Sequence, residues 1–550
     1  MRFVCRDWTR DCQSQLFWFF PLCSLRLLLF KSEFLLTASE EFEQKETKIT
    51  KEDREVGARG FARTPRRELD LARCCRDFAY PANDFNRLQL REKRMSERIP
   101  KEFMGNGAVE MELEMMSMSR KMFCKCLLVL SFAFLGVLLA GTSRAAEPLP
   151  NVVMLIGDDM GWADYGFMGH DVVKTPCLDR LAGEGALFPN GYVPTSLCRA
   201  SLATLLTGLY ASQHKICCND PPKGVDRSLM LPFLRDAPTI PRLLKDHGYR
   251  SLQTGKFWEG HFSNGGFTEG MTVKGRHGDD GLVIGRQTMQ PIYDFITSCD
   301  KTPFFVWYSP ILPHEPHNPP ERILKKYLVD GRDVRQAKYW AMCEWFDETC
   351  GQLVQWIDDH GRKDSTLIVY VVDNGWLQTN EPVRQGDQFL TRSKNTPYED
   401  GVRTPIILRR PGWIPPSRRA ELVSTIDLAP TILAACGVPA PAKSPGLNLL
   451  PLVRDGKPLK RHDVFGEIYL HDCVELGQPK LSVTHRWIRH DDWKLIVPTK
   501  PGTAPELFRV SDDPHEKRDL ASTEQGRVAE LRELLDQRWN PQAEKVGHDR

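Results

Sequence analysis

The sequence lacks the excess of basic charge that marks a dedicated nucleic-acid binder. Its 550 residues include 74 lysines and arginines against 72 aspartates and glutamates, so the formal net charge is only +2. We therefore expect no nucleic-acid partner. The sequence also contains no internal repeat, and its 41% hydrophobic and 27% charged residues are ordinary for a globular protein. A chain of this length can form one large catalytic domain with an appendage.

A run of uncharged residues long enough for an ordinary membrane-spanning helix is also missing. The apolar run from Cys126 to Gly141 is short for a span. Basic residues precede it at 120–121 and small residues follow it up to Ala145, which is the order found in a secretory signal peptide. We expect a signal peptide over 122–145, with a buried helix or a membrane anchor as the alternative. The mature protein would be exported, to the periplasm or the extracellular space, with no stable membrane span.

Signal peptides act at the beginning of a chain, so the residues before this one need an explanation. We expect native translation to begin at Met116, Met118 or Met122, which makes 1–121 a disordered or non-native extension. Seven of the 16 cysteines precede the predicted cleavage point and nine follow it. Because nine is an odd number, at least one thiol stays unpaired, and the spacing gives no disulfide connectivity.

After the predicted cleavage point, short apolar runs alternate with amphipathic helices. Residues 152–157, 304–308 and 367–372 read as buried strands, and this alternation favours a parallel sheet with helices on both faces. The last hundred residues instead combine short strands with a final helix, for which Ser522, with Gln525 three residues further on, is the predicted N-cap. We predict an α/β fold with a large mixed, mostly parallel sheet sandwiched by helices over 146–450. A small C-terminal α+β subdomain (antiparallel sheet plus helix) is expected over 451–550.

Two of the predicted strands end in paired oxygen ligands. Asp158 and Asp159 follow the first strand, and Asp373 and Asn374 follow a later one. In open α/β sheets the ligand crevice lies at the carboxyl ends of the strands. Three carboxylates brought together there would repel one another unless a divalent cation lay between them. Between the two strands, Cys198 stands at the start of an apolar helix, so an active site with a metal and a nucleophile is the leading interpretation.

Further motifs occur in order between about residue 150 and residue 520. They are Asn151-Val-Val-Met-Leu-Ile-Gly-Asp-Asp159, Cys198 with Leu205-Leu206-Thr207-Gly208, Thr254-Gly255-Lys256, Pro313-His314, Asp373-Asn374-Gly375, Lys394 with Glu399-Asp400-Gly401-Val402-Arg403, and Glu506-Leu507-Phe508. In this order and spacing they resemble the type I sulfatase family, the formylglycine-dependent branch of the alkaline-phosphatase-like superfamily. The resemblance covers most of the mature chain and implies a sulfuric ester hydrolase.

The resemblance also implies a cofactor and a nucleophile. Asp158, Asp159, Asp373 and Asn374, together with residue 198, would bind one calcium ion, or magnesium. Cys198 would be oxidised by a formylglycine-generating enzyme during maturation, and the hydrate of the resulting formylglycine would be the nucleophile. One of its hydroxyls would attack sulfur and release the alcohol, and the second would then expel sulfate, which divides one difficult displacement into two steps.

Two lysines and a histidine complete the implied site. Lys256 and Lys394 match family lysines that bracket the sulfate ester and stabilise charge on the leaving oxygen. His314 matches the histidine that protonates the leaving group. His317, in the same proline-rich loop, is a weaker candidate for contact with substrate.

The sequence departs from the family pattern at two positions. The modification signal reads cysteine, any residue, proline or alanine, any residue, arginine, but Leu202 occupies the arginine position. Arg199 lies next to Cys198 instead and projects about 100° away from it on a helix, so its contact with a substrate anion is a weak prediction. Trp258 replaces a family histidine that helps to release sulfate. His261 could substitute for that histidine only if its loop folds back.

We therefore predict hydrolysis of a sulfate ester, carried by a sulfated small molecule or polysaccharide, with a carbohydrate favoured. Three alternatives remain. A related phosphate or phosphonate monoester hydrolase could use the same metal and nucleophile. The two departures would also suit a catalytically degenerate binder of sulfated glycans. An unmodified thiol nucleophile is the third, although a thiolate gives no easy route to the elimination of sulfate.

Overall fold

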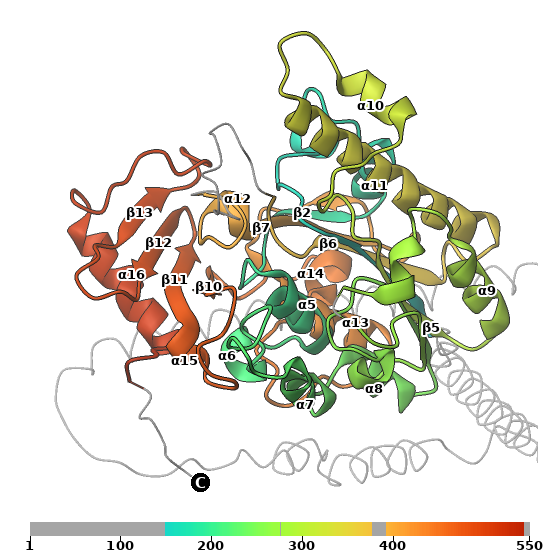
Figure 1. Cartoon of the computed structure of the whole chain (residues 1–550), viewed down its shortest axis with the longest axis horizontal. Helices are drawn as coiled ribbons and strands as arrows, with labels where there is room; N and C mark the ends of the chain where they lie inside the picture. Colours follow the sequence, from blue (N-terminus) through green and yellow to red (C-terminus); the bar gives the residue numbers. More distant parts are fainter. Residues whose placement is uncertain (1–148, 276, 377–391, 544–550) are drawn as a thin grey trace, which may run out of the picture. The chain divides into compact units, whose positions relative to one another are not determined.

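The computed structural model describes residues 149–275, 277–376 and 392–543. The predicted extension 1–121 and signal peptide 122–145 lie outside these residues. The central feature is a nine-stranded sheet with the order β4-β3-β5-β1-β6-β7-β2-β8, in which β9 also pairs with β2 (Figure 1). Among the described helices, none combines the length and apolar character needed to cross a membrane.

The strands of this sheet are mostly parallel. β1 pairs in parallel with β5 and β6, and β3 pairs in parallel with β5, whereas β7 runs antiparallel to both β6 and β2. The prediction of a mixed, mostly parallel sheet is therefore confirmed. The bounds are β1 (Asn151–Gly157), β2 (Ala186–Tyr192), β3 (Arg250–Gly255), β4 (Glu269–Gly270), β5 (Phe304–Ser309), β6 (Thr366–Val372), β7 (Arg403–Arg409), β8 (Ser417–Arg418) and β9 (Val423–Ser424).

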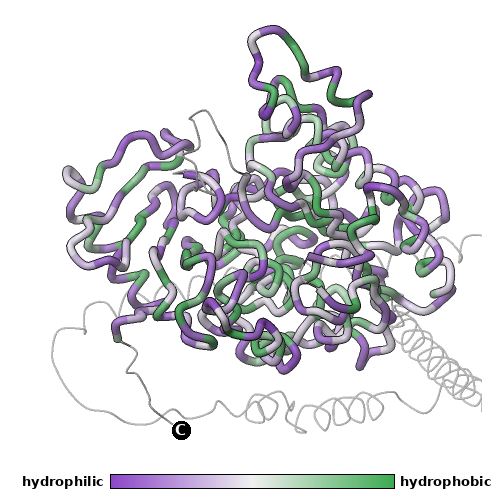
Figure 2. Tube along the Cα trace, viewed as in Figure 1, coloured by the Kyte–Doolittle hydropathy of each residue, from purple (hydrophilic) through white to green (hydrophobic). Residues whose placement is uncertain are grey.

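Helices cover both faces of the sheet, as predicted. Successive residues of β1 point to opposite faces, so Val152 and Met154 belong to one hydrophobic cluster and Val153 and Leu155 to another. Figure 2 shows hydrophobic segments concentrated around the sheet. One cluster takes in α5 (Cys198–Thr207), α8 (Ile240–Lys245), α13 (Leu428–Ala435) and α14 (Leu450–Asp455), and the other takes in α4 (Pro176–Glu184), α9 (Gln290–Cys299) and α11 (Val334–Asp359).

Shorter elements connect these layers. β6 is followed by α12 and β7, which begin at Glu399 and Arg403. The short helices and turns are η2 (Gly166–Met168), α6 (Ala211–His214), η3 (Arg227–Met230), α7 (Leu231–Arg235), η4 (Phe262–Gly265), η5 (Asp279–Val283), α10 (Glu321–Tyr327), α12 (Glu399–Val402), η6 (Thr425–Asp427) and α15 (Pro479–Ser482).

The C-terminal part forms the predicted antiparallel sheet with a helix. Its strands are β10 (Asp463–Tyr469), β11 (Val483–His490), β12 (Trp493–Pro498) and β13 (Glu506–Arg509), in that order. The final helix, α16 (Gln525–Arg538), packs Leu531 and Leu535 against this sheet. The predicted N-cap at Ser522 is wrong, because α16 begins after Glu524 and has no side-chain cap.

Candidate active site

Adjacent parallel strands bring the predicted acidic residues together. β1 and β6 are paired with Gly157 opposite Val372, so Asp158 and Asp373 leave neighbouring strands at the same edge of the sheet. The backbone N–H of Asp373 donates to the oxygen of Gly157 at 3.0 Å. The backbone N–H of Asp159 donates to Oδ1 of Asp373 at 3.1 Å. The sheet itself therefore assembles the cluster.

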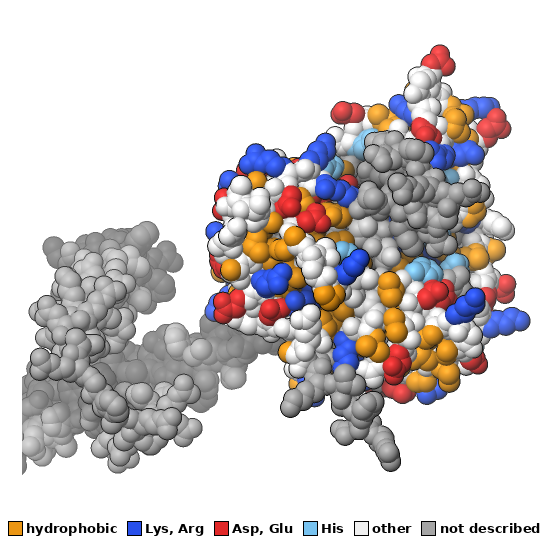
Figure 3. Space-filling model, turned by 60° about the vertical axis from the view of Figure 1, so that its left-hand side comes forward, with side chains coloured by type: hydrophobic (Ala, Val, Ile, Leu, Met, Phe, Trp, Pro, Cys, Tyr) orange, Lys and Arg blue, Asp and Glu red, His pale blue; other side chains and the backbone are white. Residues whose placement is uncertain are grey.

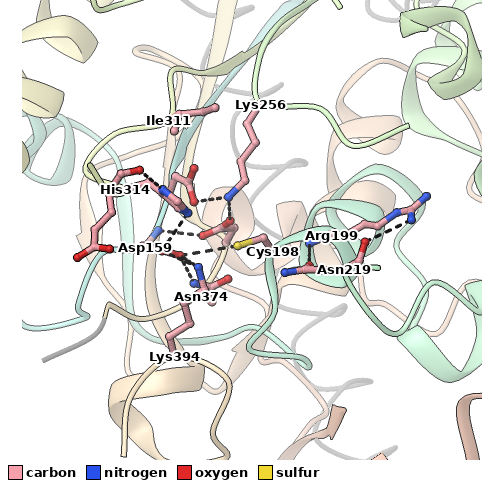
Figure 4. A network of polar contacts seen from close by, with 12 residues as sticks. Asp159, Cys198, Arg199, Asn219, Lys256, Ile311, His314, Asn374 and Lys394 are labelled. Carbon is pink, nitrogen blue, oxygen red and sulfur yellow. Dashed lines mark hydrogen bonds and ion pairs between the residues drawn. The ribbon is translucent and has the colours of Figure 1, made fainter. Parts of the chain in front are cut away.

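Asn374 and Cys198 join this cluster (Figure 4). Nδ2 of Asn374 donates to Oδ1 of Asp159 at 2.6 Å. Cys198 is the first residue of α5, a helix whose ten residues are all buried, and its Sγ lies 3.8 Å from the same Oδ1. Burial raises the pKa of the Cys198 thiol to about 12. Burial by itself thus favours the protonated form of an unmodified thiol at this position.

Two buried lysines face the carboxylates. Lys256 follows β3, and its Nζ contacts Asp158 and lies 3.2 Å from Oδ2 of Asp373. Nζ of Lys394 lies 2.6 Å from both carboxylate oxygens of Asp159. Burial opposes the ionisation of Asp159, but the nearby Lys394 ammonium outweighs it and the pKa of Asp159 is lowered. The ammonium groups thus hold positive charge against the acidic cluster.

The acidic cluster nevertheless retains unsatisfied oxygen atoms. Burial raises the pKa of Asp158, and it raises the pKa of Asp373 to about 7. Oδ2 of Asp158 and Oδ1 of Asn374 are buried and have no hydrogen-bond partner among the described residues. Ligand atoms of Asp158, Asp159, Cys198 and His314 lie within 4.8 Å of one another. Unpaired hard oxygens in an anionic cluster are what calcium or magnesium binds, so the residues present fit a divalent cation.

The two predicted histidines differ in position. Nε2 of His314 lies 3.5 Å from Oδ2 of Asp159, while its Nδ1 lies 2.5 Å from the carbonyl oxygen of Glu315. Burial lowers the pKa of His314. The ring of His317 instead packs near Tyr339 and Trp376, with centroid distances of 5.7 and 6.1 Å. Burial lowers the pKa of His317 to about 4. His314 is therefore the imidazole that contacts the acidic cluster.

The structure does not bring Arg199 or His261 to the cluster. The Arg199 guanidinium is buried and forms a bidentate ion pair with Glu259, at 2.7 and 2.6 Å. Figure 4 shows the Arg199 side chain pointing away from the acidic cluster. The exposed ring of His261 lies 2.8 Å from Oγ of Ser263 at the start of η4. The weak prediction that Arg199 reaches a substrate anion has no support in this geometry, since Glu259 already pairs its charge.

One further histidine near the cluster was not identified from the sequence. The ring of His277 packs edge-on against Trp258, with centroids 4.5 Å apart, and its centroid lies 6.3 Å from that of His314. His277 lies between β4 and η5. A histidine within a glycine-rich loop carries no local signal of its target, so single-sequence reasoning could not select it.

Comparison with known proteins identifies the family. The sulfatase family model matches residues 150–438, and a model of the C-terminal region of N-sulphoglucosamine sulphohydrolase matches residues 391–545. The chain belongs to the sulfatase family, and the predicted enzyme class, sulfatase, is confirmed.

Individual proteins agree with this assignment. The N-acetylgalactosamine-6-sulfatase of Sus scrofa is 29% identical over 470 residues, covering 72% of this chain and 86% of that protein. A solved structure in complex with its substrate D-glucosamine-2-N,6-O-disulfate is 20% identical, with a TM-score of 0.56, and covers 72% of this chain and all of that one. The phosphonate monoester hydrolase of Agrobacterium radiobacter is 18% identical, with a TM-score of 0.56, and covers 71% and 95% of the two chains. The two solved structures share the fold.

Proposed function

We propose that this sulfatase hydrolyses a sulfate ester by means of a formylglycine made from Cys198 and a single divalent cation, calcium or magnesium. The observation that carries the proposal is the acidic cluster beside Cys198. Asp158 and Asn374 are 0% and 1% exposed, and Oδ2 of Asp158 and Oδ1 of Asn374 have no hydrogen-bond partner among the described residues. Asp158, Asp159, Asp373 and Asn374 would hold the cation. When bound, it would neutralise sulfate oxygens and acidify a coordinated hydroxyl.

The lysines of the site would act on the sulfate ester. Lys256 and Lys394 are both buried, and each holds its ammonium against a carboxylate of the cluster. Once a cation occupies the cluster, these ammonium groups can turn part of their hydrogen-bonding capacity towards the sulfate oxygens and the leaving oxygen. Fixed donors in a buried site stabilise developing charge more strongly than donors in water do.

His314 would supply the proton for the leaving alcohol. The short contact of its Nδ1 with the Glu315 carbonyl orients the ring so that Nε2 points towards Asp159 and the reacting centre. A ring fixed in this way can donate a proton from Nε2 at the point where the leaving oxygen gains charge. The N-terminus of α5, which begins at Cys198, would place the positive end of the helix dipole near the anion.

We propose a sulfated carbohydrate as the substrate and an exported location for the protein. A solved structure with this fold contains a doubly sulfated glucosamine as its substrate, which supports the substrate class without defining the sugar. Acidic and basic side chains are interspersed on the face drawn in Figure 3, so no broad basic patch for a polyanion is seen there. Substrate choice would depend on the loops over 217–236, 264–286 and 378–396, of which residues 276 and 378–391 lie outside the description.

A phosphate or phosphonate monoester hydrolase is the second candidate, because a phosphonate monoester hydrolase has the same fold. The test compares sulfate, phosphate and phosphonate esters of one aryl alcohol on the purified, calcium-loaded protein, alongside the mass of the peptide that contains residue 198. We expect an aldehyde at residue 198 and the highest kcat/KM for the sulfate ester. Preference for the phosphonate would favour the second candidate. A thiol at residue 198 with no turnover of any ester would favour a non-catalytic binder.

A further inference from the structure

We propose that His277 is a sulfate-binding residue of this site, donating an N–H to a sulfate oxygen from the side of Lys256. The inference deepens the proposed function, since sulfate is the group that the enzyme would transfer. It identifies an imidazole in the region where Trp258 replaces the family histidine, and it comes from a loop about 20 residues further along the chain.

A stack of glycines holds His277 against the end of β3. Gly278 has a φ of 124°, and a Cβ there would lie 2.2 Å from the oxygen of Gly255 and 3.4 Å from Cα of Lys256. A Cβ on Gly281 would lie 2.9 Å from the nitrogen of Gly255. Gly255 itself packs so closely on β5 that its Cβ would lie 1.8 Å from the oxygen of Ser309. Only glycine allows these contacts, so the backbone beside His277 is fixed to the backbone beside Lys256.

Hydrogen bonds strengthen the same attachment. Oγ1 of Thr272 donates to the oxygen of Gly278 at 3.1 Å. On the other side, the backbone N–H of Lys256 donates to the oxygen of Ser309 at 2.6 Å, and Nε1 of Trp307 donates to the oxygen of Lys256 at 3.2 Å. The backbone beside His277 is thus bonded to Thr272, just after β4, and the backbone of Lys256 is bonded to β5; both strands pair with β3, which suits a preorganised binding residue.

Two ring contacts place the His277 side chain. Its ring meets the Trp258 ring at 78° with centroids 4.5 Å apart, and Arg227 lies 4.9 Å from the centroid of the same indole. The centroid of His277 lies 6.3 Å from that of His314, whose Nε2 is 3.5 Å from Asp159. The His277 ring therefore packs on Trp258 and lies near His314, the imidazole that contacts the acidic cluster.

The chemistry of an imidazole suits this position. Imidazole donates an N–H to an anionic oxygen whether it is neutral or protonated, and a hydrogen bond to a charged acceptor is stronger than one between neutral groups. A sulfate group held between Lys256 and the cation would present an oxygen to this side of the site. His261, the alternative substitute for the missing histidine, is exposed and makes its contact with Ser263 instead.

The experiment measures binding of inorganic sulfate to the calcium-loaded protein by titration calorimetry, with kcat/KM for an aryl sulfate measured in parallel. We expect His277→Ala to weaken sulfate binding by about 10-fold or more, the effect of losing one charge-assisted hydrogen bond. His277→Gln should retain part of the affinity, because its amide can still donate. His261→Ala is the matched control and should change the affinity less than about two-fold, as for a surface side chain without contact to the ligand.

Labelling the histidine rings with ¹⁵N gives a readout that does not depend on the stability of a variant. The His277 ring signals, assigned from their loss in His277→Gln, should shift when sulfate is added to the wild-type protein. Absence of that shift, absence of sulfate binding by the wild type, or wild-type affinity in His277→Ala would each overturn the assignment. If sulfate binds through His277 but no ester is hydrolysed, the proposed hydrolysis fails and the assignment stands. If the ester is hydrolysed but sulfate binding is unaltered in the His277 variants, the assignment of His277 fails and the proposed hydrolysis stands.

Discussion

Two buried clusters of acidic and basic side chains, one around Asp159 and one around Glu399, are balanced differently. Glu399 accepts a hydrogen bond from Oη of Tyr192 at 2.8 Å and one from Nζ of Lys494 at 3.0 Å, and Arg403 and Arg489 lie 3.6 and 3.7 Å away. Although burial opposes its ionisation, Lys494 and the two arginines lower the pKa of Glu399 to about 2. With Glu516, whose Oε1 lies 3.0 Å from Nζ of Lys494, two buried carboxylates here face three cationic side chains, so the protein itself supplies the compensating charge.

The cluster around Asp159 is not compensated in this way. Three carboxylates share two ammonium groups, and two oxygen atoms in the cluster have no hydrogen-bond partner among the described residues. Burial raises the pKa of Asp373 to about 7, in contrast to that of Glu399. The Glu399 cluster therefore joins α12 to the C-terminal sheet, whereas the Asp159 cluster keeps an excess of carboxylates over ammonium groups, which supports the proposal that it binds a cation.

The largest effect is expected from removing the nucleophile. Cys198→Ala should lower kcat for the sulfate ester by at least ~10⁴-fold, as for removal of a covalent nucleophile in other enzymes. Steady-state kinetics and thermal melting of the variant check this. Cys436→Ala, at a buried cysteine that packs in the core with Tyr249, is the control and should keep wild-type kcat. Residual turnover above a hundredth of the wild-type rate in Cys198→Ala would contradict the assignment.

The second-largest effect is expected from chelation of divalent cations, which should affect the Asp159 cluster and not the Glu399 cluster. Removal of divalent cations should lower activity by about 10³-fold, since a bound metal supplies several kcal/mol of stabilisation in the transition state. Restoring calcium to 100 times its Kd should stabilise the fold by about 2.7 kcal/mol, because it binds only the folded protein. Activity and melting temperature, measured with and without calcium, check this. In Glu399→Gln the gain in stability on adding calcium should be unchanged. Loss of that gain would show that the two clusters are not independent.

Substitution at the compensated cluster should affect stability and not chemistry. Glu399→Gln removes the buried carboxylate that Lys494, Arg403 and Arg489 share, although Lys494 keeps its ion pair with Glu516, and should lower the free energy of unfolding by about 3–5 kcal/mol. Denaturant unfolding measures the loss, and kcat per folded molecule should stay within about two-fold of wild type, as for a residue outside the active site. A metal-dependent change in kcat would show that this cluster also belongs to the catalytic machinery.

The stabilisation that Glu399 provides should be lost gradually as the pH falls. Its pKa is lowered from 4.5 to about 2, so the stability it contributes is fully present above pH 4.5 and is lost as the pH falls towards 2. The difference in unfolding free energy between the wild type and Glu399→Gln should therefore shrink over this range. Chemical denaturation at a series of pH values checks it. A constant difference down to pH 2 would mean that the lowered pKa is not the source of the stabilisation.

The smallest effect is expected at an ion pair on the surface. Arg322 and Glu348 make a bidentate contact at 2.7 and 2.5 Å, but the arginine side chain is 60% exposed. Solvent and salt screen such pairs, so Glu348→Gln should change the free energy of unfolding by less than about 1 kcal/mol. Denaturant unfolding at low and high salt tests this. A loss of unfolding free energy equal to that of Glu399→Gln would contradict the view that burial decides how much an ion pair contributes.

Much of the fold could be predicted because its strands are continuous apolar runs. The runs that end at Asp158 and Asp373 are buried on both sides, as parallel strands between two helical layers must be. The order of strands was not readable, and the pairing of β1 with β6 is what brings the two acidic ends together. The cap at Ser522 failed because a serine followed three residues later by glutamine is only a local signal, and α16 is held by packing of Leu531 and Leu535.

The site was predictable where residues follow strands and unpredictable where loops fold back. Lys256 follows β3 directly, so its arrival at the cluster needs only the sheet. The partner of Arg199 is Glu259, 60 positions away, and His277 reaches Trp258 through a stack of glycines. Such contacts depend on three-dimensional closure of loops, which neither periodicity nor spacing in one sequence encodes.

The most direct test of the unbalanced acidic cluster is the metal content of the purified protein. Elemental analysis after dialysis against trace calcium or magnesium should find one divalent ion per chain in the wild type and in Glu399→Gln. It should find almost none in a variant that combines Asp373→Ala with Asn374→Ala. A wild-type protein without a bound divalent ion, or a double variant that keeps one, would contradict the claim that these side chains were arranged to hold a cation beneath residue 198.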